Sequence, residues 1–536
     1  MDRKADEWMK DNNLLEVNQL EIGILSGKKK KGIVNRISFG IKTGEIIGIV
    51  GESGSGKSMT ALSILGLLPE GIKILNGSIQ FEGKEITNFT KKQLRTLRGK
   101  NIGMIFQEPM TSLNPLVKVG IQVEEMLLNH TKLNKEERKN PILSKFEEVG
   151  LEDCEKIYEK YPHQLSGGMR QRVMIAMAMI CNPKLLIADE PTTALDVTVQ
   201  SQILELIKKL NKEYGTSVIL ISHDLGVISS ICNRALVVRQ GRIIEEGLVT
   251  EIFQNPKEEY TKNLLRSVPG IHNRIGNIKM NTNQELSHRK ESILRIEGLD
   301  AFYEEKQEKS WKRGKKKVLE NISLEVYKGE IYGIVGESGS GKSTLAKVIA
   351  GIHKDINGSI ILKETRPMMV FQDSYGSLNP AKKISWILEE PLKICGGYSK
   401  RDRLHIVSDM LEQVGLEEEY KNRYLNELSG GQRQRVGIAA SLMLQSEFII
   451  LDEPVSALDV TVQAQILNLL MHLREKYNLT LLFISHDLNV IRQICDRVCV
   501  LHEGKIVETA LVEELYQNPS HEYSKILIDS IPIWDN

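Results

Sequence analysis

Short apolar runs alternate with longer amphipathic segments along this chain. Continuous apolar runs of four or five residues occur at 46–50, 185–188 and 218–221, and again at 331–335, 448–451 and 481–484. Runs this short, without interspersed polar residues, are typical of strands that are buried on both faces of a parallel sheet. The segments between them have helical periodicity. The pattern therefore predicts doubly wound α/β cores, and its recurrence predicts two of them.

The two halves are copies of each other with one difference in length. Matching aspartates in the back parts, Asp189 and Asp452, are 263 positions apart, whereas Gly51 and Gly336 in the front parts are 285 apart. The second front part is therefore shorter by 22 residues. The first half has room for an additional strand and helix within 79–98 that the second half lacks.

The seam between the copies is polar. Residues 271–290 contain Asn-rich and charged stretches without apolar periodicity, which is typical of a linker. We predict a first domain at 1–270 and a second domain at 291–536. An inserted helical region is expected between the core strands of each, at 107–165 and 372–428.

A glycine-rich loop follows the first apolar run of each half and opens a helical segment. Each copy fits G-x-x-x-x-G-K-[ST], and the two copies are Gly51-Glu52-Ser53-Gly54-Ser55-Gly56-Lys57-Ser58 and Gly336-Glu337-Ser338-Gly339-Ser340-Gly341-Lys342-Ser343. Backbone N–H groups of such a loop surround an anion at the positive end of the helix. The lysine is placed where it can reach the terminal phosphates of a nucleotide. The hydroxyl of the final serine is placed where it can ligate Mg²⁺. A simple glycine turn is the alternative, which the exact duplication disfavours.

Acidic pairs end another strand in each half. These pairs are Asp189-Glu190 and Asp452-Glu453. At the carboxyl end of a core strand they would lie beside the phosphate-binding loop. The aspartate could hold Mg²⁺, and the glutamate could activate water for attack on the γ-phosphorus. If such a pair occurred once, it could equally be two surface carboxylates at a strand end without a catalytic role. Its occurrence behind both glycine-rich loops disfavours this alternative.

Two further polar side chains recur after core strands. His223 and His486 each stand in Ile-Ser-His-Asp-Leu, and we expect them near the γ-phosphate. Gln107 and Gln372 follow Met-Ile-Phe and Met-Val-Phe, where the amide could contact Mg²⁺ or water and respond to a neighbouring subunit.

A second pair of glycine-rich segments completes the set. Leu165-Ser166-Gly167-Gly168 and Leu428-Ser429-Gly430-Gly431 each precede an apolar helix. Ser and Gly at a helix N-terminus form another anion-binding site. One loop per half already surrounds the phosphates. A second site per half therefore predicts binding from the opposite side, with the halves head to tail and ATP between them.

Composition narrows the class of protein. The 536 residues are 41% hydrophobic and 26% charged with a formal net charge of +1, so a nucleic-acid partner that needs a basic surface is not expected. The basic runs 28–31 and 312–317 are expected to be solvated hairpin tips. No apolar run approaches the length of a membrane span, and 1–13 lacks a signal-peptide core, so a cytoplasmic location is expected. The six scattered cysteines predict reduced thiols.

Taken in order, these motifs resemble those of the ATP-binding-cassette (ABC) ATPases over nearly the whole chain. The resemblance implies two tandem ABC-type P-loop NTPase domains, each an α/β RecA-like core with a helical subdomain and a small antiparallel β subdomain. It also implies that Lys57 faces Ser429 and Gly431 across ATP, and that Lys342 faces Ser166 and Gly168. Tyr303 occupies the place of the aromatic residue that stacks on adenine, whereas Ile24 stands there in the first half. The Lys, Gln, Glu and His positions are intact in both halves, which predicts two hydrolytic sites.

A narrower resemblance involves the segment after each Gln and the tail after each cassette. Ser112-Leu113-Asn114-Pro115 and Ser377-Leu378-Asn379-Pro380 are similar to the ATPases of oligopeptide, dipeptide and nickel importers, and so are the tails around Tyr260 and Tyr523. The resemblance implies a peripheral subunit on the cytoplasmic face of the cell membrane. Its partners would be two integral-membrane permease subunits and, through them, an extracellular solute-binding protein.

Two other functions stay open at this point. One is a soluble twin-cassette ATPase that acts on ribosomes or DNA, which the short polar seam and the near-zero charge disfavour. The other is a cassette pair for an exporter, which the importer-type motifs disfavour. Peptide, glutathione, nickel and metal chelate all remain open as the cargo.

Overall fold

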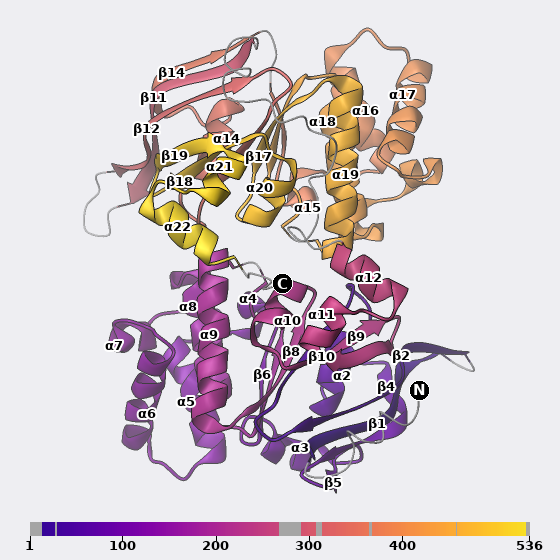
Figure 1. The fold of residues 1–536 in the computed structure, drawn as a ribbon, viewed down its shortest axis with the longest axis vertical. Coiled ribbons are helices and arrows are strands. Elements are labelled where there is room, and N and C mark those ends of the chain that lie inside the picture. The colour runs from indigo at the N-terminus through magenta and orange to yellow at the C-terminus, as the bar shows by residue number, and fades with distance from the viewer. Residues whose placement is uncertain are drawn as a thin grey trace. The chain divides into compact units, whose positions relative to one another are not determined.

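The computed structural model describes residues 13–26, 29–193, 195–266, 291–306, 313–363, 367–456 and 458–531. Leaving aside residues 196–198, the described chain divides into one compact unit that ends at 266 and a second that begins at 291 (Figure 1). The predicted linker at 271–290 lies outside the described residues. The domain bounds given above therefore stay a prediction.

The core of the first unit is a six-stranded sheet in the order β10-β9-β3-β8-β7-β6. Its strands are β3 (Ile46–Val50), β6 (Ile102–Ile105), β7 (Leu185–Asp189), β8 (Ser217–Ser222), β9 (Arg234–Arg239) and β10 (Arg242–Leu248). All pairs are parallel except β9 with β10. Every residue of β3, β7 and β8 is buried, which explains why the middle of each strand is apolar.

A second, antiparallel sheet of the first unit has the order β2-β1-β4-β5. Its strands are β1 (Asn13–Ser26), β2 (Lys29–Lys42), β4 (Ile72–Phe81) and β5 (Lys84–Glu85), and helix α3 (Lys91–Leu97) follows them. The strand β5 and the helix α3 confirm the additional elements expected at 79–98. The basic residues Lys30 and Lys31 are exposed, but they belong to strand β2 and not to a loop, because β2 pairs with β1 along their whole length, up to Ser26 and Lys29.

Helices surround the core sheet of the first unit and form a separate helical layer. They are α2 (Lys57–Ile64), α4 (Pro109–Ser112), α5 (Val119–His130), α6 (Lys135–Glu148), α7 (Cys154–Tyr158), α8 (Gly167–Met179), α9 (Val197–Tyr214), α10 (Leu225–Ile231), α11 (Val249–Gln254) and α12 (Glu259–Arg266). Helices α5, α6, α7 and α8 pack on one another as the predicted helical subdomain (Figure 1). The glycine-rich loop leads into α2, which begins at Lys57, three residues earlier than the apolar pattern indicates.

The second unit repeats this plan. Its six-stranded sheet has the order β15-β16-β17-β13-β18-β19 and its antiparallel sheet the order β12-β11-β14. The strands are β11 (Ser292–Lys306), β12 (Arg313–Tyr327), β13 (Ile331–Val335), β14 (Ile356–Leu362), β15 (Met368–Val370), β16 (Phe448–Asp452), β17 (Thr480–Ile484), β18 (Arg497–His502) and β19 (Lys505–Leu511). Between β14 and β15 the described residues include no helix, which agrees with the shorter front part.

The helices of the second unit correspond to those of the first. They are α14 (Lys342–Ile349), α15 (Ser374–Ser377), α16 (Ile384–Cys395), α17 (Lys400–Gln413), α18 (Gly430–Leu442), α19 (Val460–Tyr477), α20 (Leu488–Ile494), α21 (Val512–Gln517) and α22 (Glu522–Asp529). Buried side chains form one cluster under α16, α18 and α19 and another between α14 and the antiparallel sheet. Within the part of the chain that the structure describes, no helix has both the length and the apolar character that a membrane span requires.

Candidate functional site

Each glycine-rich loop connects a buried central strand to a helix, as the motif requires. In the first unit it runs from β3 to α2, and in the second from β13 to α14. The crown of the first loop, at Ser53 and Gly54, is exposed, whereas Lys57 at the helix start is buried. The loop is therefore an open concavity with a cationic side chain at its base.

Two glycines of each loop are required by geometry. A Cβ at Gly51 would lie 2.0 Å from the carbonyl oxygen of Val238, and one at Gly336 would lie 2.1 Å from that of Leu501. The residues directly before the two helices, Gly56 and Gly341, have φ values of 100° and 109°, in the left-handed region where a side chain is strained. The loop can thus lie against the next strand and turn its N–H groups inward.

The lysine is held in place by the backbone of its own loop. The ammonium Nζ of Lys57 donates to the carbonyl oxygens of Gly51 at 2.7 Å and Glu52 at 2.9 Å. Lys342 makes the same two bonds at 2.7 and 2.8 Å. Burial lowers the pKa of Lys342, which the negative charge of Glu453 partly offsets. A phosphate at the loop would meet a positioned ammonium group.

The serine that ends each loop reaches the aspartate at the end of β7 or β16, one strand beyond the neighbour of the strand that leads into the loop. The hydroxyl of Ser58 donates to Asp189 at 3.0 Å, and that of Ser343 donates to Asp452 at 3.1 Å. Burial raises the pKa of Asp189 to about 6, although the hydroxyl opposes this, and burial also raises that of Asp452. A cation at this position would favour the ionised carboxylates.

The glutamate, histidine and glutamine predicted from separate motifs form one cluster in each half. Glu190 accepts a hydrogen bond from the Gln107 amide at 2.9 Å and lies 3.2 Å from Nδ1 of His223. In the second half the amide of Gln372 lies 2.7 Å from Glu453, and Nδ1 of His486 lies 3.2 Å from it. The structure therefore brings together three strand ends that are far apart in the sequence.

The glutamate and the histidine of each cluster favour opposite charges on each other. Burial alone would raise the pKa of Glu190, but the hydrogen bond and charge of His223 lower it below its usual value. Burial alone would lower the pKa of His223, but Glu190 raises it. Glu453 and His486 shift in the same directions for the same reasons. An ionised carboxylate is thus kept ready to accept a proton.

Both glutamates have a left-handed backbone. Glu190 and Glu453 each have a φ of 48°, a conformation that costs on the order of 1 kcal/mol or more for a residue with a side chain. Their N–H groups donate to the carbonyl oxygens of Ile221 and Ile484 at 2.9 and 3.0 Å. These bonds to the adjacent strand fix the turn that directs each carboxylate toward its histidine. Such strain is typical of functional positions.

One contact of the first cluster is not predicted from the sequence. The hydroxyl of Thr193 donates to the carboxylate of Glu190 at 2.9 Å. The matching Ser456 instead donates to the backbone oxygen of Glu453 at 3.2 Å. Both hydroxyls lower the pKa of the carboxylate three residues before them, although only Thr193 makes a close bond to it.

The Ser-Gly-Gly segments begin helices α8 and α18, as expected. Ser166 caps α8 by accepting the N–H of Met169 at 3.3 Å. A Cβ at Gly168 would lie 2.8 Å from a methyl group of Val199, so this glycine also permits close packing of α8 against α9. Ser429 and Gly431 occupy the same places in α18. That Lys57 faces Ser429 and Gly431, and Lys342 faces Ser166 and Gly168, stays a prediction.

The expected adenine platform differs between the halves. Tyr303 is half-exposed and stacks on His353, with ring centroids 4.5 Å apart. Ile24, at the corresponding place in β1, is exposed to a similar degree but carries no ring. His353 was not identified from the sequence, since it lies beyond the helix that follows the loop. The role of Tyr303 in binding adenine stays a prediction.

The loops fit a phosphate ligand and a hard cation. The hydroxyl oxygens of Ser55 and Ser340 are buried without a hydrogen-bond partner among the described residues, at the base of each loop. The described residues contain no group of three His, Cys, Asp or Glu side chains that could bind a metal alone. A Mg²⁺ ion here would therefore depend on Ser and Asp oxygens together with the phosphates, as Mg²⁺ usually does.

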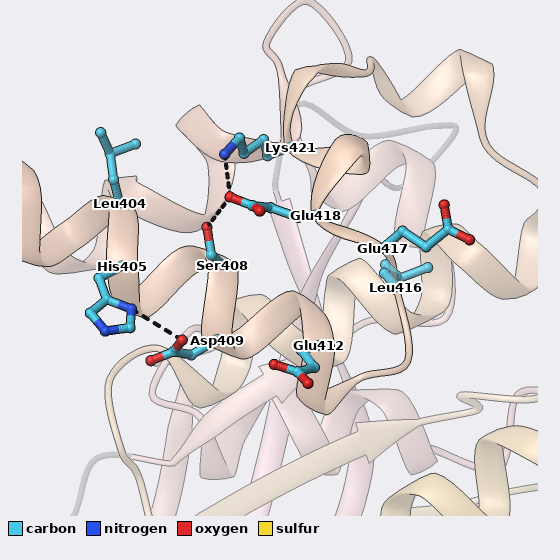
Figure 2. Close-up of a pocket in the computed structure, with 9 residues that line it drawn as sticks. All are labelled: Leu404, His405, Ser408, Asp409, Glu412, Leu416, Glu417, Glu418 and Lys421. Atoms are coloured by element: carbon cyan, nitrogen blue, oxygen red, sulfur yellow. Dashed lines mark hydrogen bonds and ion pairs between the residues drawn. The ribbon is translucent and has the colours of Figure 1, made fainter.

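An unrelated hollow lies in the helical layer of the second unit. It has a volume of about 560 Å³ between α17 and the 3₁₀ helix Glu418–Asn422 (Figure 2). Four of its charged groups form two pairs: His405 lies 3.1 Å from Asp409, and Glu418 contacts Lys421 as well as Ser408 (Figure 2). None of the predicted site residues lines it.

One family profile matches both halves of the chain, each of which contains the Gln, Glu and His cluster described above. The profile of the ABC transporter family matches residues 34–193 and 319–456. The chain belongs to the ABC transporter family. The profile of the oligopeptide/dipeptide transporter C-terminal region matches residues 244–292 and 507–536, the tails that follow the two cassettes.

Related ABC proteins match nearly the whole chain. The glutathione import ATP-binding protein GsiA of Escherichia coli (strain K12) is 39% identical over 97% of this chain and 90% of its own length. The peptidoglycan transport ATP-binding protein YejF of Agrobacterium fabrum is 41% identical over 97% of both chains. A solved RNase-L inhibitor covers 92% of this chain with a TM-score of 0.62 at 23% identity, which shows the likeness of the fold alone.

Membership in the ABC family settles the fold class and the type of reaction predicted from the sequence. The fold is that of two tandem ABC ATPase domains, and the protein binds ATP and hydrolyses it. The individual roles of the residues described above remain predictions.

Proposed function

We propose that each half binds Mg²⁺ and ATP at its glycine-rich loop and hydrolyses ATP with its glutamate as the general base. Lys57 and the loop N–H groups hold the phosphates. Glu190 takes a proton from the attacking water, and His223 orients that carboxylate. Lys342, Glu453 and His486 act likewise in the second half. The support is the same set of contacts in both copies.

Mg²⁺ would be held by Ser58, Asp189 and Gln107, and by Ser343, Asp452 and Gln372. Bound there together with phosphate oxygens, the ion neutralises the charge that builds up on the transferred phosphoryl group. The contacts of Ser58 with Asp189 and of Ser343 with Asp452 support this donor set. Gln107 and Gln372 contact the glutamates, so each amide could connect the cation to the general base.

We further propose that the two halves close head to tail on ATP. In this arrangement Ser166 and Gly168 of α8 contact the nucleotide of the second loop, and Ser429 and Gly431 contact that of the first. Each helix N-terminus would add N–H groups to the γ-phosphate from the opposite side. Hydrolysis would then release the halves, and this cycle would drive a partner between two states.

The partner that we infer is the membrane permease of an importer for peptides or related small solutes. The observation that carries this inference is the match of both tails to the oligopeptide/dipeptide transporter C-terminal region. Relatives named for glutathione import and peptidoglycan transport support the same solute class. The protein would be a peripheral subunit on the cytoplasmic face of the membrane. It would bind two permease subunits, and an extracellular binding protein would deliver the solute to them.

Uptake in cells tests this proposal. The gene would be deleted in its own host and restored as the parent or as the Glu190→Gln/Glu453→Gln variant, and uptake of radiolabelled dipeptides, tripeptides and glutathione would be measured. We expect the deletion to lose uptake of at least one of these solutes, the parent to restore it, and the variant not to. Unchanged uptake of all of them in the deletion strain would refute the importer assignment for this solute class.

A further inference from the structure

The C-terminal tail of each cassette contacts the glycine-rich loop of the same unit. The hydroxyl of Tyr260, in α12, accepts the N–H of Glu52 at 3.2 Å. The hydroxyl of Tyr523, in α22, accepts the N–H of Glu337 at 3.1 Å. Both tyrosines are buried, and more than 180 residues separate each from its partner. The same contact in two copies of divergent sequence points to a shared purpose.

The peptide that receives this contact also holds the lysine of the loop. The N–H of Glu52, which donates to Tyr260, shares its peptide group with the carbonyl oxygen of Gly51, and that oxygen accepts Nζ of Lys57 at 2.7 Å. The peptide group between Gly336 and Glu337 connects Lys342 and Tyr523 in the same way. Each tyrosine thus fixes the orientation of a backbone group that positions the phosphate-binding ammonium.

Two further contacts hold each tyrosine in position. Glu245, on β10, accepts the N–H groups of Lys257 and Glu258 at 2.8 and 3.2 Å, just before α12 begins. Arg239, at the end of β9, lies over the Tyr260 ring, with its guanidinium carbon 4.7 Å from the ring centroid. The tail helix is therefore fixed to the core at its start and at its tyrosine.

The second tail is attached in the same way. Glu508, on β19, accepts the N–H groups of Ser520 and His521 at 2.8 and 3.0 Å. The His502 ring stacks on Tyr523 with the centroids 3.8 Å apart. Burial raises the pKa of Tyr523 to about 12, so its hydroxyl stays protonated at physiological pH.

We propose that Tyr260 and Tyr523 are positioning residues for ATP, through which the docked C-terminal tail sets the affinity of each glycine-rich loop for nucleotide. The proposal rests on the proposed function in one respect, that these loops bind ATP. A tail that lifted away from its cassette would release the Glu52 or Glu337 peptide and, with it, the lysine. Anything that binds the tail could in this way change the ATP affinity of that site.

Removal of the two hydroxyl groups tests the proposal. The full chain would be compared with its Tyr260→Phe/Tyr523→Phe variant in steady-state ATP hydrolysis and in equilibrium binding of trinitrophenyl-ATP. Loss of a bond that organises the loop before ATP binds should raise KM for ATP and the Kd of the probe by about 5- to 20-fold, with kcat changed by less than about threefold.

The matched control is Tyr516→Phe. This tyrosine, in α21, donates its hydroxyl to the carbonyl oxygen of Leu488 and not to the loop, and the first half has Phe253 at the same place. We expect the control to keep KM within about twofold of the parent. A double phenylalanine variant with a lowered melting temperature but parental KM and Kd would reduce the tyrosines to a structural role and overturn the proposal.

A second pair of variants acts on the other end of the tail. Glu245→Gln/Glu508→Gln weakens the attachment of both helices, and we expect KM to rise in the same direction. When the glutamine and phenylalanine substitutions are combined, the fold-increase in KM should be smaller than the product of the two separate fold-increases, because both act through docking of the tail. A combined fold-increase in KM equal to that product would contradict an action of both substitutions through tail docking. A parent that binds no ATP would instead refute the proposed function itself.

Discussion

Replacement of Glu190 and Glu453 by glutamine removes the proposed base from each site while keeping the shape of the side chain. Glu453 accepts the amide of Gln372 at 2.7 Å and lies 3.2 Å from His486. Both contacts use the same oxygen of Glu453, so one glutamine oxygen can accept both. At Glu190 the contacts with Gln107 and His223 use different oxygens, so glutamine keeps an acceptor for only one of them. The left-handed turn at each position is a property of the backbone and tolerates both residues equally. ATP binding and folding should therefore persist in the variant.

The expected fall in kcat follows from the loss of the proton acceptor. A positioned general base contributes about 10²- to 10⁴-fold to the rate, which corresponds to about 2.7–5.5 kcal/mol of activation free energy. The doubly substituted protein should therefore retain at most about 1% of the parent kcat. Each single variant keeps one intact site and should lose much less. The melting temperature should change little at Glu453, where one amide oxygen can keep both hydrogen bonds, and more at Glu190, where one contact loses its acceptor.

The assay is phosphate release at saturating ATP, with ATP affinity measured in parallel by equilibrium binding. The expected result is a kcat at or below about 1% of the parent with a Kd within about threefold. A double variant that retained more than a tenth of the parent rate would refute the assignment of these glutamates as general bases. Loss of ATP binding would refute the structural reasoning about the amide.

Three other substitutions test separate parts of the structure. Gly51→Ala places a methyl group 2.0 Å from the carbonyl oxygen of Val238, so we expect at least a tenfold loss of ATP affinity in equilibrium binding, and an unchanged affinity would contradict the geometry. Tyr303→Ala should raise KM for ATP by about three- to tenfold through lost stacking, whereas Ile24→Ala should change it by less than about twofold. Glu508→Gln should lower the melting temperature at pH 7. Although burial opposes it, hydrogen bonds from the tail lower the pKa of Glu508, so its stabilising effect is present above about pH 4.3 and is lost as the pH falls through the folded-state pKa. A difference in melting temperature from the parent that stayed constant down to pH 3 would refute this.

The sequence predicts the secondary structure of the core well because the central strands are apolar on both faces. Strand β8 at Ser217–Ser222 and strand β17 at Thr480–Ile484 extend the predicted runs by one or two residues. Helix α2 begins at Lys57, earlier than expected, because the loop glycine Gly56 provides the turn and polar residues continue the helix. Apolar periodicity cannot detect a helix start of this kind.

The site was only partly predictable, and long-range contacts explain the difference. Repetition of the motifs in order identified Glu190, His223 and Gln107, and the structure brings them together. The left-handed φ of Glu190 leaves no trace in the residue type, since glutamate does not favour it. The Tyr260 bond to Glu52 joins positions 208 residues apart, and no local pattern predicts such a pair.

Permease dependence of ATP hydrolysis tests the central claim most directly. The rate of ATP hydrolysis by the purified protein would be measured alone, in vesicles that contain the permease subunits of its own transport system, and with ribosomes or DNA. The account predicts a severalfold stimulation by the permease vesicles and a further rise when a solute-loaded binding protein is added. A rate that the permease leaves unchanged and that ribosomes or DNA raise would contradict it.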